Sequence, residues 1–385
     1  MVNTRWRMEI RDDSLAIIGV CDVYTDFTAR LSHRAPGGWT MVLPADHDQS
    51  ALFVPGSRLV AWAPWSVDVP FLTGPATAIA VTTPPSATMT VNGVDDTALL
   101  ADRLVLPDPT SALDDQDDSA YYTLTAAAEG VIRQVVEDNA GTLALTGRYV
   151  CNGDPDSRLT VPGSLLGSTT SITARFTNLL TLIAEVASRD NLAVSVVQVG
   201  EELHLLVSES IDRTASVRLS QDTGTLTSGA ASLSMPTTTR VLVAGGGEGV
   251  DRVFVERSNP SLEADWSRRV EVFRDARDTS DLTELQQRGD ETLADAAASV
   301  AGISLDPVDL PGQGFGTHYH LGDTITVEMG SQSWTDIVTQ VDVQVSAAGS
   351  TVVKPTVGAS TSATPAIYRR VRDLTRRLEA LERRQ

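Results

Sequence analysis

Two histidines near the C-terminal end have the spacing that best suits metal chemistry. His318 and His320 are separated by a single residue, so on a strand both imidazoles would lie on the same face. Imidazole binds zinc, but a zinc site needs further ligands, and Asp323 is the nearest acidic residue. A polar loop beside a strand accounts for the same residues without a metal. The sequence therefore predicts no cofactor and leaves these three residues as candidate metal ligands.

A glycine-rich segment at residues 244–249 has the composition of a phosphate-binding loop. It reads AGGGEG and lacks the lysine and the Ser or Thr of a P-loop. The residues that follow, VDRVFVERS, have the composition of a strand, whereas a dinucleotide fingerprint leads into a helix. We therefore expect a turn between two strands here, and no nucleotide site.

Two runs of acidic residues are the other candidates for metal binding or catalysis. Residues 46–48 read DHD and residues 114–118 read DDQDD, but neither run has the spaced carboxylates and closing Glu of an EF-hand loop. Solvated loops explain both, with a calcium site as the alternative. The sequence has no GxSxG or HExxH signature, although paired carboxylates for glycoside cleavage stay open among 50 acidic residues. We predict that the protein is not an enzyme.

The amino-acid composition argues against several further classes of protein. A net charge of -20 argues against binding to nucleic acid, because attraction to phosphate needs clustered Lys and Arg. Cys21 and Cys151 make neither a disulfide framework nor a zinc site, and each is expected to be a small buried hydrophobe. The charged N-terminal residues do not suit a signal peptide, and no apolar stretch is long enough to span a membrane. We expect synthesis and folding in a cytoplasm.

Residues 1–100 have the alternation and the Gly/Pro punctuation of a β-rich domain. Short apolar runs separated by turn residues favour a barrel or a sandwich. The dipeptide Asn92-Gly93 is typical of a type I′ hairpin turn, so a turn is expected there. The predicted strands lie at residues 6–10, 14–23, 27–32, 39–44, 52–64, 71–82 and 88–94.

The middle of the chain, residues 101–230, is expected to form one or more α+β modules. Residues 107–118 read as an acidic loop, and residues 126–139 and 171–190 as helices with apolar faces. Phe176 is one of the residues that recur at helical spacing in the second helix. A hairpin at residues 192–210 follows, and a helix packed on such a hairpin is a small α+β unit.

Residues 231–358 return to strands, with one inserted helix at residues 281–300. Asp281 and Glu284 have the spacing of a capping box, and Gly289 would either kink the helix or admit another backbone. The apolar face of this helix is expected to consist of Leu282, Leu285, Leu293, Ala297 and Val300. Strands are predicted at residues 321–329, 334–344 and 350–357.

The C-terminal end has the pattern of a coiled-coil helix. After a linker at residues 359–366, apolar residues at alternating spacings of four and three form a heptad seam along residues 367–385. This tail carries a net charge of +4, counted from residue 366, so the rest of the chain carries -24. Because a lone helix of this length is marginal in water, it is expected to associate with copies of itself or with a partner. The predicted oligomer interface is Ile367, Val371, Leu374, Leu378 and Leu381.

Several short segments of the sequence, in this order, resemble segments of the tail-tip (baseplate) hub proteins of long-tailed siphophages, which are related in fold to the central hub of contractile tails. One such segment, PGGWTMVLP, lies near the N-terminus, and the middle module contains no specific segment of this kind. The C-terminal segments are VAGGGEGVDRV (243–253), WSRRVEVFRDARD (266–278), LTELQQRGDETL (282–293) and LGDTITV (321–327).

The resemblance implies a mainly β, α+β multidomain fold with two β-barrel-like domains related to tail-tube subunits. These would be residues 1–100 and 231–358, flanking the small α/β modules, with the coiled-coil helix after them. Three chains would form a ring that adapts a six-fold tube to a three-fold tip at the end of the virion tail. The implied partners are other copies of the chain, the distal tail ring, the tape measure, and tip or fibre proteins. Such hubs support tail assembly and genome passage.

Two other functions stay open at this stage. A receptor- or glycan-binding tip module would need an exposed aromatic cluster, for which Trp62, Trp65 and Phe71 are the candidates, although a core position explains them equally. A tail-associated cell-wall hydrolase is the third hypothesis.

Overall fold

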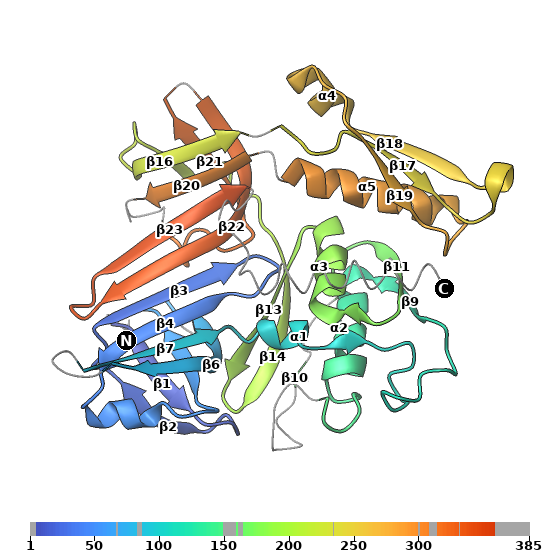
Figure 1. Cartoon of the computed structure of the whole chain (residues 1–385). Coiled ribbons are helices and arrows are strands. Elements are labelled where there is room, and N and C mark those ends of the chain that lie inside the picture. The colour runs from blue at the N-terminus through green and yellow to red at the C-terminus, as the bar shows by residue number, and fades with distance from the viewer. Residues whose placement is uncertain are drawn as a thin grey trace. The chain divides into compact units, whose positions relative to one another are not determined.

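A computed structural model describes residues 5–66, 68–82, 87–148, 159–160, 165–233, 235–298, 301–307, 314–330 and 332–358. The chain forms two compact units (Figure 1). Unit 1 contains residues 1–227 and 306–355, and unit 2 contains residues 228–305 and 356–362.

The N-terminal part of unit 1 is an antiparallel sheet of the predicted short strands. Its strand order is β3-β4-β7-β6-β5-β1-β2, so β2 pairs with β1 alone among the described strands and the sheet does not close into a barrel. The strands are β1 (Arg7–Arg11), β2 (Ile17–Cys21), β3 (Asp26–Ser32), β4 (Gly38–Pro44), β5 (Arg58–Trp62), β6 (Leu72–Val81) and β7 (Thr88–Val94).

Strand β6 allows this sheet to fold over a core. Its first residues pair with β5 and its later residues pair with β7, with a register shift between Ala76 and Ala78. On β4, every second side chain is buried, as expected for a strand with one face on a core. Buried residues of these strands include Met8, Ile10, Phe27, Ala29, Trp39, Met41, Leu43, Leu59, Ala61 and Val91.

The expected turn at Asn92-Gly93 is wrong. Both residues lie inside β7, where Asn92 pairs with Thr40 and Gly93 pairs with Trp39 of β4. The glycine is needed for a different reason, because a Cβ at residue 93 would overlap the Trp39 indole. Asn92 Oδ1 instead accepts a hydrogen bond of 2.8 Å from the Thr40 hydroxyl across the strands.

Strands from the C-terminal part of the chain complete the sheet of unit 1. The long strand β22 (Gln332–Ser346) pairs first with β21 (Thr324–Met329) and then, from Gln340 onward, with β3. The short strand β15 (Arg218–Ser220) pairs with β21 in parallel, so the sheet is mixed. Segments from both predicted β-domains therefore share one sheet. The predicted boundaries at residues 100 and 230 stay a prediction.

The middle of unit 1 is an α+β module, as expected. Its core consists of apolar residues from α2, α3, β13 and neighbouring strands, including Val131, Val135, Ile183, Val186, Leu192 and Leu203. The elements are α1 (Ala98–Ala101), β8 (Leu104–Val105), β9 (Tyr122–Ala127), α2 (Ala128–Ala140), β10 (Leu159–Thr160), β11 (Thr169–Ala174), β12 (Thr177–Asn178), α3 (Leu179–Arg189), β13 (Leu192–Val199) and β14 (Glu202–Glu209). The hairpin predicted at residues 192–210 is confirmed as β13 and β14.

The helix predicted at residues 171–190 begins later than expected. Residues 169–174 form β11, in which Ile172 and Ala174 are buried on alternate positions, and only α3 is helical. Phe176 has a φ of 52°, which no α-helix contains, and Asn178 then caps α3 by accepting from Thr181 N at 3.1 Å. The apolar residues of β11 happen to continue the helical spacing of α3, and this is why the sequence predicted a single longer helix.

Unit 2 contains a three-stranded sheet with α5 (Leu282–Ala298) packed on one face. The central strand β17 (Arg240–Ala244) pairs antiparallel with β18 (Phe254–Ser258) and parallel with β19 (Glu271–Asp275). The other elements that have residues in this unit are β16 (Leu226–Leu233), η2 (Gly249–Asp251), α4 (Pro260–Trp266), β20 (Ala301–Pro307) and the end of β23 (Thr351–Gly358). The other short helix of the chain, η1 (Asp48–Leu52), belongs to unit 1.

Asp281 caps α5 as predicted, but the reciprocal half of the capping box is wrong, because Asp281 N donates to Thr279 Oγ1 and the Glu284 carboxylate accepts from Arg288. Asp281 Oδ1 accepts hydrogen bonds from Thr283 N at 2.7 Å and from Glu284 N at 3.3 Å. Leu285 and Leu293 are buried as expected, but Leu282 is exposed because it precedes the part of the helix that covers the sheet. Gly289 admits the neighbouring strands, since a Cβ there would meet Arg257 and Val243. Val300 lies outside the described residues.

The predicted fold class is confirmed as far as a mainly β chain with few helices; the large mixed sheet was not predicted, and the two β-barrel-like domains stay a prediction. Residues 359–366 and the heptad segment 367–385 lie outside the described residues, so the predicted coiled coil stays a prediction.

Candidate functional site

The three candidate metal ligands lie in one turn but have other partners. His318 Nδ1 is 3.2 Å from Gly314 N and 2.8 Å from the Thr317 hydroxyl, and its side chain is exposed. His320 Nδ1 is 3.7 Å from Asp323 Oδ2. Among the described residues, no group of three His, Cys, Asp or Glu side chains is arranged to hold a metal ion.

Asp323 has a structural role in this turn. Its carboxylate accepts hydrogen bonds from Ile211 N at 3.0 Å and His320 N at 2.9 Å, and lies 3.6 Å from Arg213 Nε. Burial opposes ionisation, but the hydrogen bonds from His320 and Ile211 lower the pKa of Asp323 below its usual value. The carboxylate therefore stays charged and ties the β14–β15 connection to the start of β21.

The glycine-rich segment is confirmed as a connection between two antiparallel strands, β17 and β18. Gly245 N donates to Val253 O at 2.8 Å, and Gly246 N donates to Thr279 O at 2.7 Å. A Cβ at Gly245 would collide with Leu285, so this glycine allows α5 to approach. The amides of Gly245 and Gly246 are thus used within the fold.

The first acidic run lies in a turn and ends at Asp48, the first residue of η1, and the second run lies in a loop. His47 Nδ1 accepts from Gln49 N at 3.2 Å and caps η1. In the second loop, the Gln116 amide donates to the carbonyl oxygens of Asp108, Ser111 and Ala112 at 2.8–3.0 Å. The side-chain amide of Gln116 thus orders the second loop. The interpretation as solvated residues fits both acidic runs.

Two of the three aromatic candidates for receptor binding pack with each other and are half-buried. The rings of Trp65 and Phe71 each meet Trp6 edge to face, with centroids 5.6 and 5.0 Å away. Trp6 is buried, and its indole N–H donates to Thr351 Oγ1 at 2.8 Å. Trp62 is covered by the Arg7 guanidinium at 5.0 Å. The positions of these three aromatic residues fit the alternative that they pack within the fold and do not form a receptor-binding cluster.

A buried carboxyl pair connects the N-terminal sheet with the α+β module. Asp96 forms an ion pair with Arg58 and accepts from the Thr73 hydroxyl at 2.6 Å. Thr73 Oγ1 in turn accepts from Gln198 N of β13 at 2.9 Å. The neighbouring Asp95 accepts from Gly37 N at 2.8 Å, but its Oδ1 is buried without a hydrogen bond. Burial raises the pKa of Asp95 to about 7.

The sheet of unit 2 carries an exposed apolar surface that the sequence did not predict. On the sheet face opposite α5, Leu242 lies beside Phe273, and Phe254 lies beside Ala244. Leu242, Phe254 and Phe273 are 43, 52 and 54% exposed. We call this surface the open face. The alternation of β17 and β18 was a signal for part of this surface, but only the strand register brings the three residues together.

Arg252 crosses the open face between the two phenylalanines. Its guanidinium carbon is 5.9 Å from the Phe254 ring centroid and 5.7 Å from that of Phe273. It also donates to Gly245 O and Ala244 O at 2.9 Å each and forms an ion pair with Asp275. These contacts fix the position of the Arg252 guanidinium.

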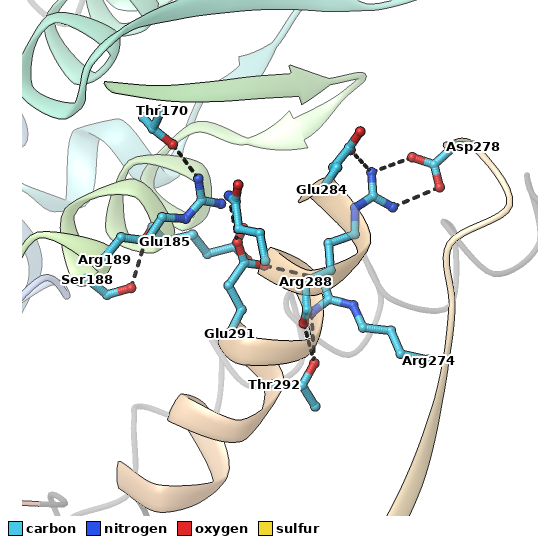
Figure 2. Close-up of polar contacts among 11 residues, drawn as sticks. Thr170, Glu185, Ser188, Arg189, Arg274, Asp278, Glu284, Arg288, Glu291 and Thr292 are labelled. Carbon is cyan, nitrogen blue, oxygen red and sulfur yellow. Dashed lines mark hydrogen bonds and ion pairs between the residues drawn. The ribbon is translucent and has the colours of Figure 1, made fainter. Parts of the chain in front are cut away.

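The opposite face of the same sheet is closed by α5. Figure 2 shows Arg274 of β19 donating to Arg288 O and to Thr292 Oγ1 of α5, the latter at 2.8 Å. Arg288 makes two bonds to Asp278, at 2.8 and 2.5 Å, and another to Glu284 at 2.5 Å. Burial opposes the charge of Arg288, but these carboxylates raise its pKa above the usual value. The sheet therefore has one fixed face and one open face.

The predicted oligomer interface at residues 367–381 lies outside the described residues. None of the described helices is long and apolar enough to cross a membrane.

Comparisons with known proteins give a family and a fold. A family model described as Siphovirus ReqiPepy6 Gp37-like protein matches residues 7–359. Among solved structures, the 43 kDa tail protein of prophage MuSo2 from Shewanella oneidensis is similar with a TM-score of 0.62 and 10% identity, covering 92% of this chain and 98% of that one. No curated protein matches the chain.

Two further tail proteins have a similar fold. The tail protein from Neisseria meningitidis MC58 has a TM-score of 0.58 at 10% identity, covering 92% of this chain and 96% of that one. Prophage tail protein gp18 from Listeria monocytogenes EGD-e has a TM-score of 0.54 at 7% identity, covering 96% of this chain and 99% of that one. At these identities the likeness concerns the fold.

Proposed function

The chain belongs to the Siphovirus ReqiPepy6 Gp37-like protein family, and from this membership we propose that it is a structural protein of the virion tail that forms a trimeric hub at the tail tip. In this role it joins the six-fold tail tube to a three-fold tip and supports tail assembly and genome passage. Its partners are other copies of itself and neighbouring tail proteins, namely the distal tail ring, the tape measure, and tip or fibre proteins.

One observation carries the proposal. The fold of this chain matches prophage tail proteins over 92% or more of its own length and over 96% or more of theirs. A shared small module would cover only part of each chain, so the likeness concerns a complete tail-protein architecture. Function does not follow from fold alone, but here the family is itself a siphovirus family.

The arrangement of the sheet supports the hub role. Strands β3 and β22, from the two ends of the chain, pair through seven residues and so give one mixed β-structure in unit 1. The resemblance to siphophage hubs implies two tube-like domains in each chain, which would give six in a ring of three. The net charge of -20 suits the wall of a channel for DNA, because a negative surface repels phosphate.

The solution mass of the purified full chain tests this proposal. We expect a trimer of about 123 kDa by light scattering, three times the 41.0 kDa of one chain. A mass of one chain throughout the micromolar range would contradict self-assembly of the hub. Immunogold labelling of whole virions then tests the location, which we expect at the tail tip.

A receptor- or glycan-binding module and a cell-wall hydrolase are less well supported. Half-buried Trp65 and Phe71 pack against the buried Trp6, and the family description and the three solved structures name no enzyme activity. A zymogram on host cell-wall material would detect a hydrolase directly.

A further inference from the structure

The turn between β3 and β4, residues 33–37, contacts three parts of unit 1. At its start, His33 N donates to a carbonyl oxygen of β22 at 2.8 Å. In its middle, Arg34 Nε donates to the first carbonyl oxygen of β13 at 2.7 Å. At its end, Gly37 N donates at 2.8 Å to Oδ2 of Asp95, the residue that follows β7. The turn therefore connects the N-terminal sheet with β22 and with the α+β module.

The Asp95 carboxyl at one end of the turn is buried without a counter-charge among the described residues. Its Oδ1 has no hydrogen-bond partner there, and β6 lies directly against it, since a Cβ at Gly74 would be 2.8 Å from Asp95 Cα. The charged neighbour on the same loop is Asp96, which is paired with Arg58 of β5. Burial and the charge of Asp96 raise the pKa of Asp95 to about 7. An ionised Asp95 would be a buried charge, which is costly unless it is paired.

The His33 imidazole at the other end of the turn is the basic counterpart of this carboxyl. Its Nε2 is buried and has no hydrogen-bond partner among the described residues. The ring lies against Gly322, where a Cβ would be 2.9 Å from His33 Nδ1 and 3.0 Å from Ser210 Oγ. Burial and the neighbouring Arg34 guanidinium lower the pKa of His33 to about 3, although the charge of Asp323 acts in the other direction.

The other charged groups near the turn keep their charge in mildly acidic and neutral solution. Burial lowers the pKa of Arg34 only to about 10, so its guanidinium stays protonated. Burial opposes ionisation of Asp323, but hydrogen bonds from His320 and Ile211 N lower its pKa below the usual value. Asp323 Oδ2 also lies 3.6 Å from Arg213 Nε. His320 is exposed, so it meets solvent whether the turn is closed or open.

The two buried groups make the closed turn depend on pH with opposite signs. The pKa of Asp95 is raised from 3.8, so its contribution to stability is full below pH 3.8 and is lost as the pH rises through about 7. The pKa of His33 is lowered from 6.5, so its contribution is full above pH 6.5 and is lost as the pH falls through about 3. The two ranges overlap between pH 3.8 and pH 6.5.

We propose that His33 and Asp95 form a compensating pair that keeps the β3–β4 turn closed to the same degree from mildly acidic to neutral solution. Opening the turn brings both side chains into water, where the carboxyl releases a proton and the imidazole binds one. Within the overlap, each effect changes the opening equilibrium by about tenfold per pH unit, but in opposite directions. The connection between the N-terminal sheet, β22 and the α+β module is therefore insensitive to pH in this range.

Hydrogen exchange of residues 33–38 in the full chain tests the proposal in the wild type, Asp95→Asn, His33→Gln and the double variant. Each exchange rate is divided by that of an unstructured peptide of the same sequence at the same pH, so that only opening of the turn is compared. Between about pH 4 and pH 6.5, we expect the wild type and the double variant to change by about threefold or less. Asp95→Asn should open about a hundredfold more at the acidic end, and His33→Gln about a hundredfold more at the neutral end.

The slope with pH is the readout, because a change in packing alone alters the exchange of a variant equally at every pH. Asp13→Asn and His318→Gln are the matched controls, since both residues are exposed, and both should follow the wild type. If His33→Gln does not fold, as judged by circular dichroism, His33→Asn is the second neutral replacement, and the same slope is expected.

Three results would overturn the proposal. The first is a wild-type change of about tenfold or more across this range, which would show that the two groups do not compensate. The second is a pair of single variants whose slopes do not have opposite signs. The third is the same set of slopes at the amides of β4, which would show that the whole sheet opens and not the turn.

Discussion

Gly93 shows how a single residue acquires its role from a neighbour on another strand. Its sequence context, Asn-Gly, is typical of a turn, but the residue lies within β7 beneath Trp39 of β4. The absence of a side chain makes room for the indole, which is buried. The same residue type is thus used for close approach and not for its backbone freedom.

Gly93→Ala should destabilise the protein because the added methyl group forces the Trp39 ring out of its position. Overpacking of this kind costs about 1–3 kcal/mol of the free energy of unfolding. Urea denaturation followed by tryptophan fluorescence would measure it. Gly130→Ala in α2 is the control, since its Cβ would meet only the ends of side chains and alanine favours a helix. Equal stability of the two variants would refute the role of Gly93.

Asp95 makes the stability of unit 1 depend on pH. Its pKa is raised to about 7 in the folded protein by burial, against 3.8 as the ordinary value. The folded state therefore holds this proton more tightly, and its contribution to stability is full below pH 3.8 and is lost as the pH rises through 7. The neighbouring Asp96 stays paired with Arg58.

Asp95→Asn should stabilise the protein above pH 7, because asparagine can accept from Gly37 N without a charge. We expect a gain on the order of 2 kcal/mol in the free energy of unfolding at pH 8. The gain should shrink towards pH 4, where the native carboxyl is neutral. Denaturation of both proteins at several pH values measures the difference. A difference that does not change with pH would contradict a raised pKa.

The sheet of unit 2 illustrates what each element contributes. β17 and β18 alternate in burial, so that Val241 and Val243 lie under α5 while Leu242 lies on the open face. Helix α5 is fixed at its start by Asp281 and along its length by the Arg274 and Arg288 contacts. One helix thus closes one face of the sheet and leaves the other available.

Asp281→Ala should weaken the start of α5 because Thr283 N and Glu284 N would lose their acceptor. Loss of such a cap costs about 1 kcal/mol in the stability of the helix or protein. Hydrogen exchange of the α5 amides would show the effect locally as faster exchange. Asp265→Ala removes a carboxylate inside α4 without removing a cap, and exchange in α5 should not change with it. Equal exchange in both variants would argue against the cap.

The whole molecule is an acidic body with a basic C-terminal segment. The body carries -24 and the segment +4, and the linker between them is rich in Ser, Thr and Ala. The described sheets and cores lie before residue 359, so the body has its own hydrophobic cores without the segment. We therefore expect self-association to depend on the segment, whereas folding should not depend on it.

Deletion of residues 367–385 should lower the solution mass from about 123 kDa to that of single chains, with an unchanged circular dichroism spectrum of the body. Salt should act in the same direction on the full chain. At about 1 M NaCl the Debye length falls to about 3 Å, which screens the attraction between segment and body. A trimer that persists after deletion would place the interface on the body alone.

The sequence by itself determined the fold class and most elements. Alternating strands, the 192–210 hairpin, the capped α5 and the glycine turn at 244–249 all follow from local periodicity and turn chemistry, which act over a few residues. The sequence segments that resemble siphophage hubs are also consistent with the siphovirus family to which the chain belongs. Tertiary structure alone decided that β22 pairs with β3, that Asn92-Gly93 lies within a strand, and that residues 169–174 form β11. It also assembled the open face from Leu242, Phe254 and Phe273, because strand register between distant segments is set by the packing of whole faces and leaves no local signal.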